Sequence, residues 1–117
     1  GAWAATLGSR PIVSISGDGG LGQYLAEITT LVKYDMNVTH VVLNNSELGK
    51  ISREQVSAQR PVWQTELVNP DFAEYARSCG AVGLRAETPE EFSEAFIQAR
   101  DHVGPALVEV ITTSQDV

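Results

Sequence analysis

The sequence predicts an α/β fold, a three-layer sandwich in which a mostly parallel sheet carries helices on both faces. Short β-branched or apolar segments alternate along the chain with segments whose apolar residues recur at helical spacing. Parallel neighbouring strands need a crossover, which is usually a helix, so this alternation favours a parallel sheet. The 117 residues, 43% of them hydrophobic, suffice for one core. We therefore expect a single domain over residues 1–117.

The first half of the chain predicts two strands and two helices. Residues 11–16 are mostly β-branched and precede a glycine, which indicates a buried strand. Apolar residues recur at helical spacing over residues 21–34 and predict a helix with one face on the sheet. Residues 38–43 predict the second strand. The polar, glycine-containing residues 44–49 predict a loop, and residues 50–58 fit a short helix over the strand ends.

The next segments predict a helix and a strand. Residues 71–79 look helical, with Asn69 or Pro70 at the start and Gly80 as a natural stop. Residues 81–85 predict a short strand.

The last helix has the clearest start signal in the chain. Thr88 suits the N-cap, Pro89 suits the first helical position, and Glu91 is placed to complete a capping box. The predicted helix covers residues 89–102, and residues 106–111 predict a final buried strand.

Composition excludes several classes of partner. With a net charge of −7 the chain has no basic stripe for nucleic acid or an anionic membrane, and an anionic ligand would need a cation carrier. No apolar run approaches the roughly 18 residues of a spanning helix, and no leader is recognisable. The single cysteine, Cys79, cannot form an internal disulfide and suits a buried structural thiol in the cytoplasm. Residues 1–7 look like the inside of a helix, so we expect an N-terminally incomplete fragment.

A glycine-rich turn at residues 17–22 lies where the first strand ends and its helix begins. Its glycines match the G-x-G-x-x-G fingerprint of a dinucleotide site, which also follows a strand and opens a helix. That site needs an acidic residue at the end of the second strand, where this chain has Asn44-Asn45. The Asp18 carboxylate would also repel a pyrophosphate. A dinucleotide site is therefore the weaker of two alternatives.

A magnesium ion gives the Asp18 carboxylate a use. Asp18 follows one strand and Asn45 follows another, and parallel strands end at the same edge of a sheet. Mg²⁺ prefers about six oxygen ligands, of which the protein usually supplies one or two and phosphates and water the rest. Gly19 and Gly20 let the backbone approach phosphates, and a helix beginning near Leu21 directs amide groups toward them. The second alternative is thus a diphosphate held through Mg²⁺.

The motif Gly17-Asp18-Gly19, followed after 24 residues by Asn44-Asn45, resembles the G-D-G-x(24 to 27)-N-N signature of thiamine-diphosphate enzymes. Essentially the whole chain resembles the carboxyl-terminal pyrophosphate domain of the pyruvate oxidase and acetolactate synthase group. The resemblance implies a thiamine-diphosphate-binding fold, with Mg²⁺ held by Asp18, Asn45 and the backbone carbonyl of Glu47. The residues that it implies for cofactor binding are Gly17, Asp18, Gly19, Gly20, Asn45, Glu47, Leu48 and Gly49.

The residues after the asparagine pair resemble the G-x-[IV]-x-x-E segment of pyruvate oxidases, with Gly49, Ile51 and Glu54 at its fixed positions. In that group the aliphatic residue and the Glu face the reactive ring of the cofactor, which implies roles for Ile51 and Glu54 near the substrate. Glu54 equally fits the exposed face of a short helix. An acetolactate-synthase-like carboligase is the alternative reaction, although the aromatic-rich continuation usual in synthases is absent from this sequence.

The resemblance implies a larger parent enzyme that acts on pyruvate or a related 2-oxo acid, with FAD as a further candidate cofactor. Its missing parts would be the pyrimidine-binding and middle domains, and the parent would be a homodimer or homotetramer. We expect the fragment alone to be inactive, because in that family the Glu that activates the aminopyrimidine lies in another domain. The alternative from another class is a non-catalytic nucleotide- or cofactor-binding module, which has no need of Asp18 in a phosphate-facing turn.

Other polar and aromatic side chains have structural explanations. His40 lies near the start of a strand, far from the glycine turn, and suits a hydrogen-bonded structural role. His102 closes a helix, where it complements the helix dipole. Trp63 and Tyr75 are expected to be packing residues, with a pocket or a subunit contact as the alternative for Trp63. The acidic residues 87–94 are expected to form an exposed helix face.

Overall fold

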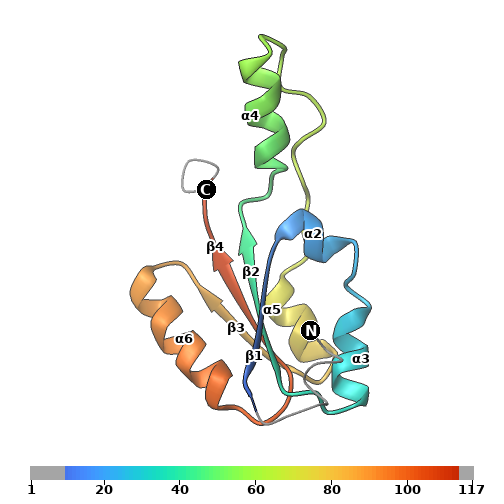
Figure 1. Ribbon diagram of the computed structural model, residues 1–117, viewed down its shortest axis with the longest axis vertical. Coiled ribbons are helices and arrows are strands. Elements are labelled where there is room, and N and C mark those ends of the chain that lie inside the picture. The colour runs from blue at the N-terminus through green and yellow to red at the C-terminus, as the bar shows by residue number, and fades with distance from the viewer. Residues whose placement is uncertain (1–9, 114–117) are drawn as a thin grey trace.

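The computed structural model describes residues 10–113, which form a parallel four-stranded sheet with helices on both faces (Figure 1). The strands are β1 (Ile12–Gly17), β2 (Val38–Asn44), β3 (Val82–Ala86) and β4 (Ala106–Ile111). They lie in the order β1-β2-β4-β3, and every neighbouring pair is parallel. The predicted α/β fold is therefore confirmed. The helix expected at residues 1–7 lies outside the described residues.

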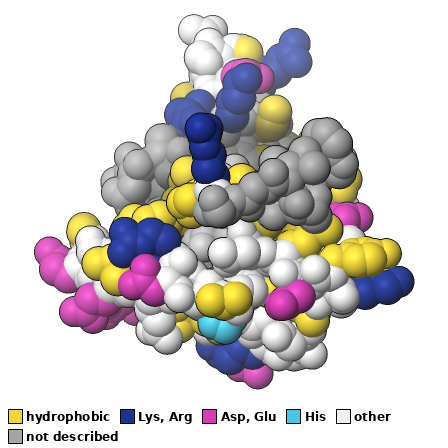
Figure 2. Space-filling model, turned by 60° about the horizontal axis from the view of Figure 1, so that its bottom comes forward, with side chains coloured by type: hydrophobic (Ala, Val, Ile, Leu, Met, Phe, Trp, Pro, Cys, Tyr) yellow, Lys and Arg dark blue, Asp and Glu magenta, His cyan; other side chains and the backbone are white. Residues whose placement is uncertain are grey.

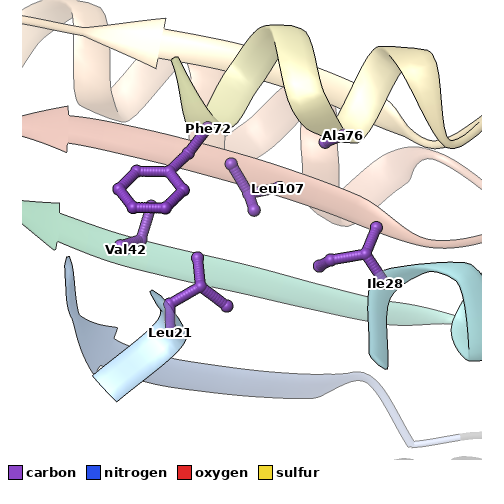
Figure 3. Close-up of a cluster of buried hydrophobic side chains, with 6 residues drawn as sticks. All are labelled: Leu21, Ile28, Val42, Phe72, Ala76 and Leu107. Atoms are coloured by element: carbon purple, nitrogen blue, oxygen red, sulfur yellow. The ribbon is translucent and has the colours of Figure 1, made fainter. Parts of the chain in front are cut away.

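Helices pack against the two faces of the sheet around two apolar clusters. The described helices are α2 (Asp18–Gly22), α3 (Glu27–Lys33), α4 (Gly49–Ser57), α5 (Phe72–Ser78) and α6 (Pro89–Asp101). One cluster joins α2, α3 and α5 to the sheet (Figure 3), through Leu21, Ile28, Val42, Phe72, Ala76 and Leu107. Tyr75 packs against this cluster as expected, and its hydroxyl donates to the Leu25 carbonyl oxygen at 3.1 Å. Cys79, which was expected to be buried, is half-buried and packs against the same cluster. The other cluster joins α6 to β3 and β4, through Ala95, Ala99, Ala106 and Val108.

Strand β1 is an edge strand, so the prediction that it is buried is wrong. Its side chains alternate between half-buried and exposed, and Val13 and Ile15 are 43% and 68% exposed. The cause is topological, because β1 lies at one edge of the sheet whereas α6 packs on β3 and β4 toward the opposite edge. Its β-branched content is typical of any strand and does not distinguish an edge strand from a central one.

The helix predicted over residues 21–34 is broken in two. Helix α2 already begins at Asp18 and ends at Gly22, and α3 starts only at Glu27. Between them the chain forms tighter turns, in which the Tyr24 amide donates to the Leu21 carbonyl at 2.8 Å. Three glycines within five residues weaken the helix at this point. The apolar periodicity survives the break because Leu21 and Ile28 both reach the core.

The caps of α5 and α6 differ in detail from the predicted ones. The N-cap of α5 is Asp71, whose carboxylate accepts from the Glu74 amide at 2.9 Å, and not Asn69 or Pro70. Thr88 caps α6 as predicted, but the Glu91 side chain accepts from the Glu87 amide at 2.7 Å and does not close the box on Thr88.

Helix α4 forms where a short helix was predicted, but it rises beyond the carboxyl edge of the sheet and does not lie across the strand ends (Figure 1). The segment that returns from it contains Trp63, which is 71% exposed, so the expected packing role of Trp63 is wrong. The Trp63 backbone amide and carbonyl instead bond to the Gln55 side chain of α4, each at 3.1 Å.

The described surface carries charges of both signs. On the face in Figure 2, acidic and basic side chains lie among hydrophobic ones and the coloured residues form no continuous basic stripe. Within residues 10–113, no helix is both long enough and apolar enough to cross a bilayer.

We expect the protein to lose stability as the pH falls below about 6.5, through His40. The half-buried His40 ring bonds to the hydroxyls of Ser14 and Ser16, the latter at 2.9 Å. Burial lowers the pKa of His40, so the folded protein binds this proton less readily than the unfolded chain. Stability is therefore greatest above the unfolded pKa and declines toward the folded one.

Denaturant unfolding at about pH 7.5 and about pH 5.5 measures this effect. The difference in the free energy of unfolding between the two pH values should shrink in His40→Gln, which keeps a polar side chain but does not titrate. An equal difference in both proteins would assign the pH dependence to other groups.

Candidate functional site

The carboxyl ends of β1 and β2 meet at one edge of the sheet, where Gly17 lies in register with Leu43. A cavity of about 230 Å³ opens at this edge, between the glycine turn, the loop after β2 and the start of α4. Its lining residues are Gly17, Asp18, Leu43, Asn45, Glu47, Gly49, Lys50 and Arg53. Residues 17–18 and residues 43–53, far apart in sequence, thus converge here, as the sheet topology predicts.

Asp18 is the buried carboxylate of this site. It is the first residue of α2, directly after β1, and it is 3% exposed. Its Oδ2 atom accepts a hydrogen bond from Asn69 Nδ2 at 2.7 Å. Within the described part of the chain this is the one hydrogen bond of the Asp18 side chain, and its Oδ1 atom accepts none.

The loop after β2 is a tight turn stabilised by its own asparagines. Asn45 Oδ1 accepts from the Glu47 amide at 3.2 Å, and Asn44 Oδ1 accepts from the Ser46 amide at 3.1 Å. Ser46 has a φ of 56°, a left-handed conformation that these bonds help to hold. The Glu47 carboxylate accepts from the Ser52 hydroxyl of α4, so the Glu47 side chain anchors α4 to this loop.

The glycines allow the turn and the loop to approach each other closely. A Cβ atom on Gly19 would lie 2.8 Å from Leu48 Cδ2, and one on Gly49 would lie 3.2 Å from Asn45 Nδ2. Gly20 is less constrained, because its nearest neighbour would be Ser16 Cβ at 3.9 Å. Gly19 and Leu48, both expected to bind the cofactor, are thus in contact.

Two cationic side chains of α4, Lys50 and Arg53, line the same cavity and were not among the predicted site residues. The Lys50 ammonium lies 3.9 Å from the Glu54 carboxylate, and both groups are largely exposed. An exposed pair of this kind is weak, so Lys50 can exchange Glu54 for an anionic ligand at little cost. Their spacing of three along a helix was the available sequence signal.

Ile51 and Glu54 do not join this group. Ile51 is 44% exposed and the Glu54 side chain 62% exposed, and neither lines the cavity. Both lie on α4, which rises away from the sheet (Figure 1). The structure thus brings together the residues expected around the phosphates and leaves the two expected near the substrate facing outward.

Behind the cavity, a chain of partly and fully buried hydrogen bonds leads from Asp18 into the sheet. Asn69 Nδ2 donates to Asp18 and, at 3.0 Å, to Asn44 Oδ1. Asn44 Nδ2 in turn donates to Glu109 Oε2 at 2.8 Å, and Glu109 Oε1 accepts from the Ala73 amide at 3.2 Å. Sequence reasoning identified neither Asn69 nor Glu109 as a site residue. The available signal was a lone carboxylate in the otherwise apolar strand 106–111.

The oxygen donors around the cavity fit a magnesium ion. Within residues 10–113 no group of three or more His, Cys, Asp or Glu side chains is placed to hold a metal. The candidate ligands therefore include amide and backbone oxygens as well as a carboxylate. They are the Asp18 carboxylate, the Asn45 amide oxygen and the Glu47 carbonyl, all hard oxygens of the kind that Mg²⁺ prefers. Three protein oxygens leave room for phosphate oxygens and water in an octahedral shell.

Comparison with known proteins identifies the family. The family profile described as "Thiamine pyrophosphate enzyme, C-terminal TPP binding domain" matches residues 1–110. The chain is 38% identical over 113 residues to the thiamine pyrophosphate-containing protein YdaP of Bacillus subtilis (strain 168), covering 95% of this chain and 20% of that protein. It is 31% identical over 99 residues to acetolactate synthase of the same organism, covering 85% of this chain and 17% of that protein. The chain thus spans about a fifth of the length of these relatives.

Solved structures share the fold. Benzoylformate decarboxylase from Polynucleobacter necessarius matches with a TM-score of 0.83 at 28% identity, over 90% of this chain and 20% of that one. The thiamine diphosphate-dependent 4-hydroxybenzoylformate decarboxylase of Rhodococcus jostii RHA1 matches with a TM-score of 0.85 at 24% identity, over 96% of this chain and 21% of that one. The second likeness concerns the fold alone.

Proposed function

Since the chain belongs to the thiamine pyrophosphate enzymes, as their C-terminal TPP-binding domain, we propose that it holds the diphosphate of thiamine diphosphate through Mg²⁺. The observation that carries this proposal is the shared cavity at the carboxyl edge of the sheet. There a buried carboxylate, an amide oxygen and a backbone carbonyl lie with two cationic side chains, from three separate segments.

Each residue has a distinct role in this proposal. Asp18, Asn45 and the Glu47 carbonyl bind the metal, which converts the repulsion between Asp18 and the diphosphate into two attractions. Lys50 and Arg53 lower the cost of bringing the diphosphate into an acidic protein. Gly19 keeps the turn close to Leu48, so that the backbone closes one side of the site. The bound cofactor itself supplies carbanion stabilisation, while the protein positions and polarises it.

The parent enzyme that we propose decarboxylates a 2-oxo acid, most simply pyruvate, in the manner of pyruvate oxidases. The Gly49, Ile51 and Glu54 pattern supports this reaction, and the similarity to a long thiamine pyrophosphate-containing protein supports the existence of further domains. Ile51 and Glu54 face outward on α4, where a pyrimidine-binding domain or a partner subunit would complete the active site. The chain alone would then be inactive.

An acetolactate-synthase-like carboligase is the second candidate. The similarity to the acetolactate synthase of Bacillus subtilis supports it. Both candidates use the same metal and diphosphate site and differ in the fate of the decarboxylated substrate.

One product analysis separates the two reactions. The full-length protein is supplied with Mg²⁺, thiamine diphosphate and pyruvate, with and without flavin and an artificial electron acceptor. We expect acetate that forms only with the acceptor, and Glu54→Gln should then slow its formation. Acetolactate formed regardless of the acceptor would establish the synthase reaction instead. Consumption of pyruvate without added thiamine diphosphate by the cofactor-stripped protein would contradict both.

A further inference from the structure

Four polar side chains, the buried Asp18, Asn44 and Glu109 and the half-buried Asn69, form one continuous chain of hydrogen bonds, which we call the Glu109 chain. We propose that Asn69 and Glu109 are positioning residues, which fix the Asp18 carboxylate in a metal-ready orientation before the cation binds. This inference rests on the proposed function of Asp18 as a magnesium ligand.

The direction of every hydrogen bond in the Glu109 chain is set at one end. Both carboxylate oxygens of Glu109 accept, one from the Ala73 amide and one from Asn44 Nδ2. Because the NH₂ group of Asn44 faces Glu109, its oxygen has to face the other way, toward Ser46 and Asn69. A carboxylate cannot donate, so this orientation of Asn44 is the one that Glu109 permits.

Asn69 transmits this orientation to the metal ligand. Asn44 Oδ1 is an acceptor, so Asn69 presents its NH₂ group, and the two protons on that nitrogen go to Asn44 at 3.0 Å and Asp18 Oδ2 at 2.7 Å. Asp18 is thereby held by one oxygen. The same amide nitrogen joins the glycine turn after β1 to the end of β2, the two segments that supply the proposed ligands.

Burial makes the Glu109 chain sensitive to any pairing of two donors or two acceptors. Glu109 is 1% exposed, and Asn44 and Asp18 are also buried, so an unpaired donor or acceptor among them costs free energy. Glu109 also accepts a hydrogen bond from the Ala73 amide, in the first turn of α5. Glu109 does not line the cavity that holds Asp18 and Asn45, and it borders a neighbouring cavity of about 320 Å³ together with Asn44 and Asn69.

The test is Glu109→Gln, a substitution that keeps the size of the side chain but replaces one acceptor by a donor. A Gln NH₂ group facing Asn44 forces the Asn44 amide to turn over, which sets donor against donor at Ser46 and Asn69. Isothermal titration of the full-length protein with Mg²⁺ in the presence of thiamine diphosphate should show a Kd about 10- to 100-fold higher, as for other residues that orient metal ligands. Glu94→Gln, on the exposed face of α6, is the matched control and should leave the Kd unchanged.

A second substitution separates positioning from general damage to the fold. Asn44→Asp alone places a second carboxylate against that of Glu109 and should also weaken Mg²⁺ binding. Combined with Glu109→Gln, it restores an acceptor that faces the introduced amide as well as Ser46 and Asn69. We expect the double variant to recover most of the lost affinity, which a merely structural role of Glu109 does not predict. If Glu109→Gln fails to fold, Asn69→Ala, which removes the half-buried link between Asp18 and Asn44, should show the same rise in Kd.

The outcomes are separable. A wild-type protein that binds no Mg²⁺ with thiamine diphosphate would overturn the proposed function, and this inference with it. Normal wild-type binding together with an unchanged Kd in Glu109→Gln would overturn the positioning role alone. Where Glu109→Gln does not fold, an unchanged Kd in Asn69→Ala would do the same. A double variant no better than Glu109→Gln would also overturn it.

Discussion

Replacing Asp18 by asparagine should raise the Kd for thiamine diphosphate in the presence of Mg²⁺ by at least about 100-fold. The substitution keeps the shape of the side chain, and the asparagine oxygen can still accept from Asn69, so the turn should persist. What is lost is the one buried carboxylate that lines the cavity. A charge–charge attraction of about 4 kcal/mol at an effective dielectric constant near 20 is enough for such a change.

Titration of the full-length protein with thiamine diphosphate, with Mg²⁺ or with a chelator, measures this prediction. The wild type should bind tightly only with Mg²⁺, and Asp18→Asn should bind weakly in both conditions. Asp101→Asn, at the exposed end of α6, is the matched control and should bind like the wild type. Unchanged Mg²⁺-dependent binding in Asp18→Asn would show that the metal assignment is wrong.

Local patterns predicted the elements of the fold well, because helix and strand periods and caps act within a few residues. Strand β4 has the predicted bounds, and Gly80, with a φ of 93°, ends α5 as expected. The exposure of Ile15 was not predictable in the same way, since it depends on which strand lies at the edge of the sheet. Strand order is a property of the whole sheet and leaves no mark in the composition of one strand.

The candidate site likewise contains residues that the sequence predicts and residues that it does not. Asp18 and Asn45 were predictable because parallel strands end at one edge, and the structure brings them to one cavity. Asn69 was expected at a helix start, but Asp71 takes that position and leaves the Asn69 amide for Asp18. Its partner Asn44 lies 25 residues away in sequence, and no local pattern encodes a hydrogen bond over that distance.

Gly83→Ala should destabilise the protein by about 3 kcal/mol or more, because it introduces a clash that no side-chain rotation can relieve. Gly83 is buried in β3, where a Cβ atom would lie 2.0 Å from the Ala73 carbonyl oxygen and 2.8 Å from the carbonyl carbon. Both atoms belong to the backbone of α5, so the helix itself would have to move away from the sheet. Arg77 Nη1 donates to the Gly83 carbonyl oxygen at 2.7 Å, which ties α5 to β3 at the same place.

A shift of α5 would also disturb the proposed metal site, because the Ala73 amide of α5 donates to Glu109. Gly83→Ala should therefore lower both the free energy of unfolding, measured with denaturant, and the affinity for Mg²⁺ with thiamine diphosphate. Gly22→Ala is the matched control, because a Cβ atom there would meet nothing within 4 Å. Equal stability of the two variants would show that α5 does not pack on β3 as closely as described. Lost stability with normal Mg²⁺ affinity would show that the Ala73 amide can shift without disturbing Asp18.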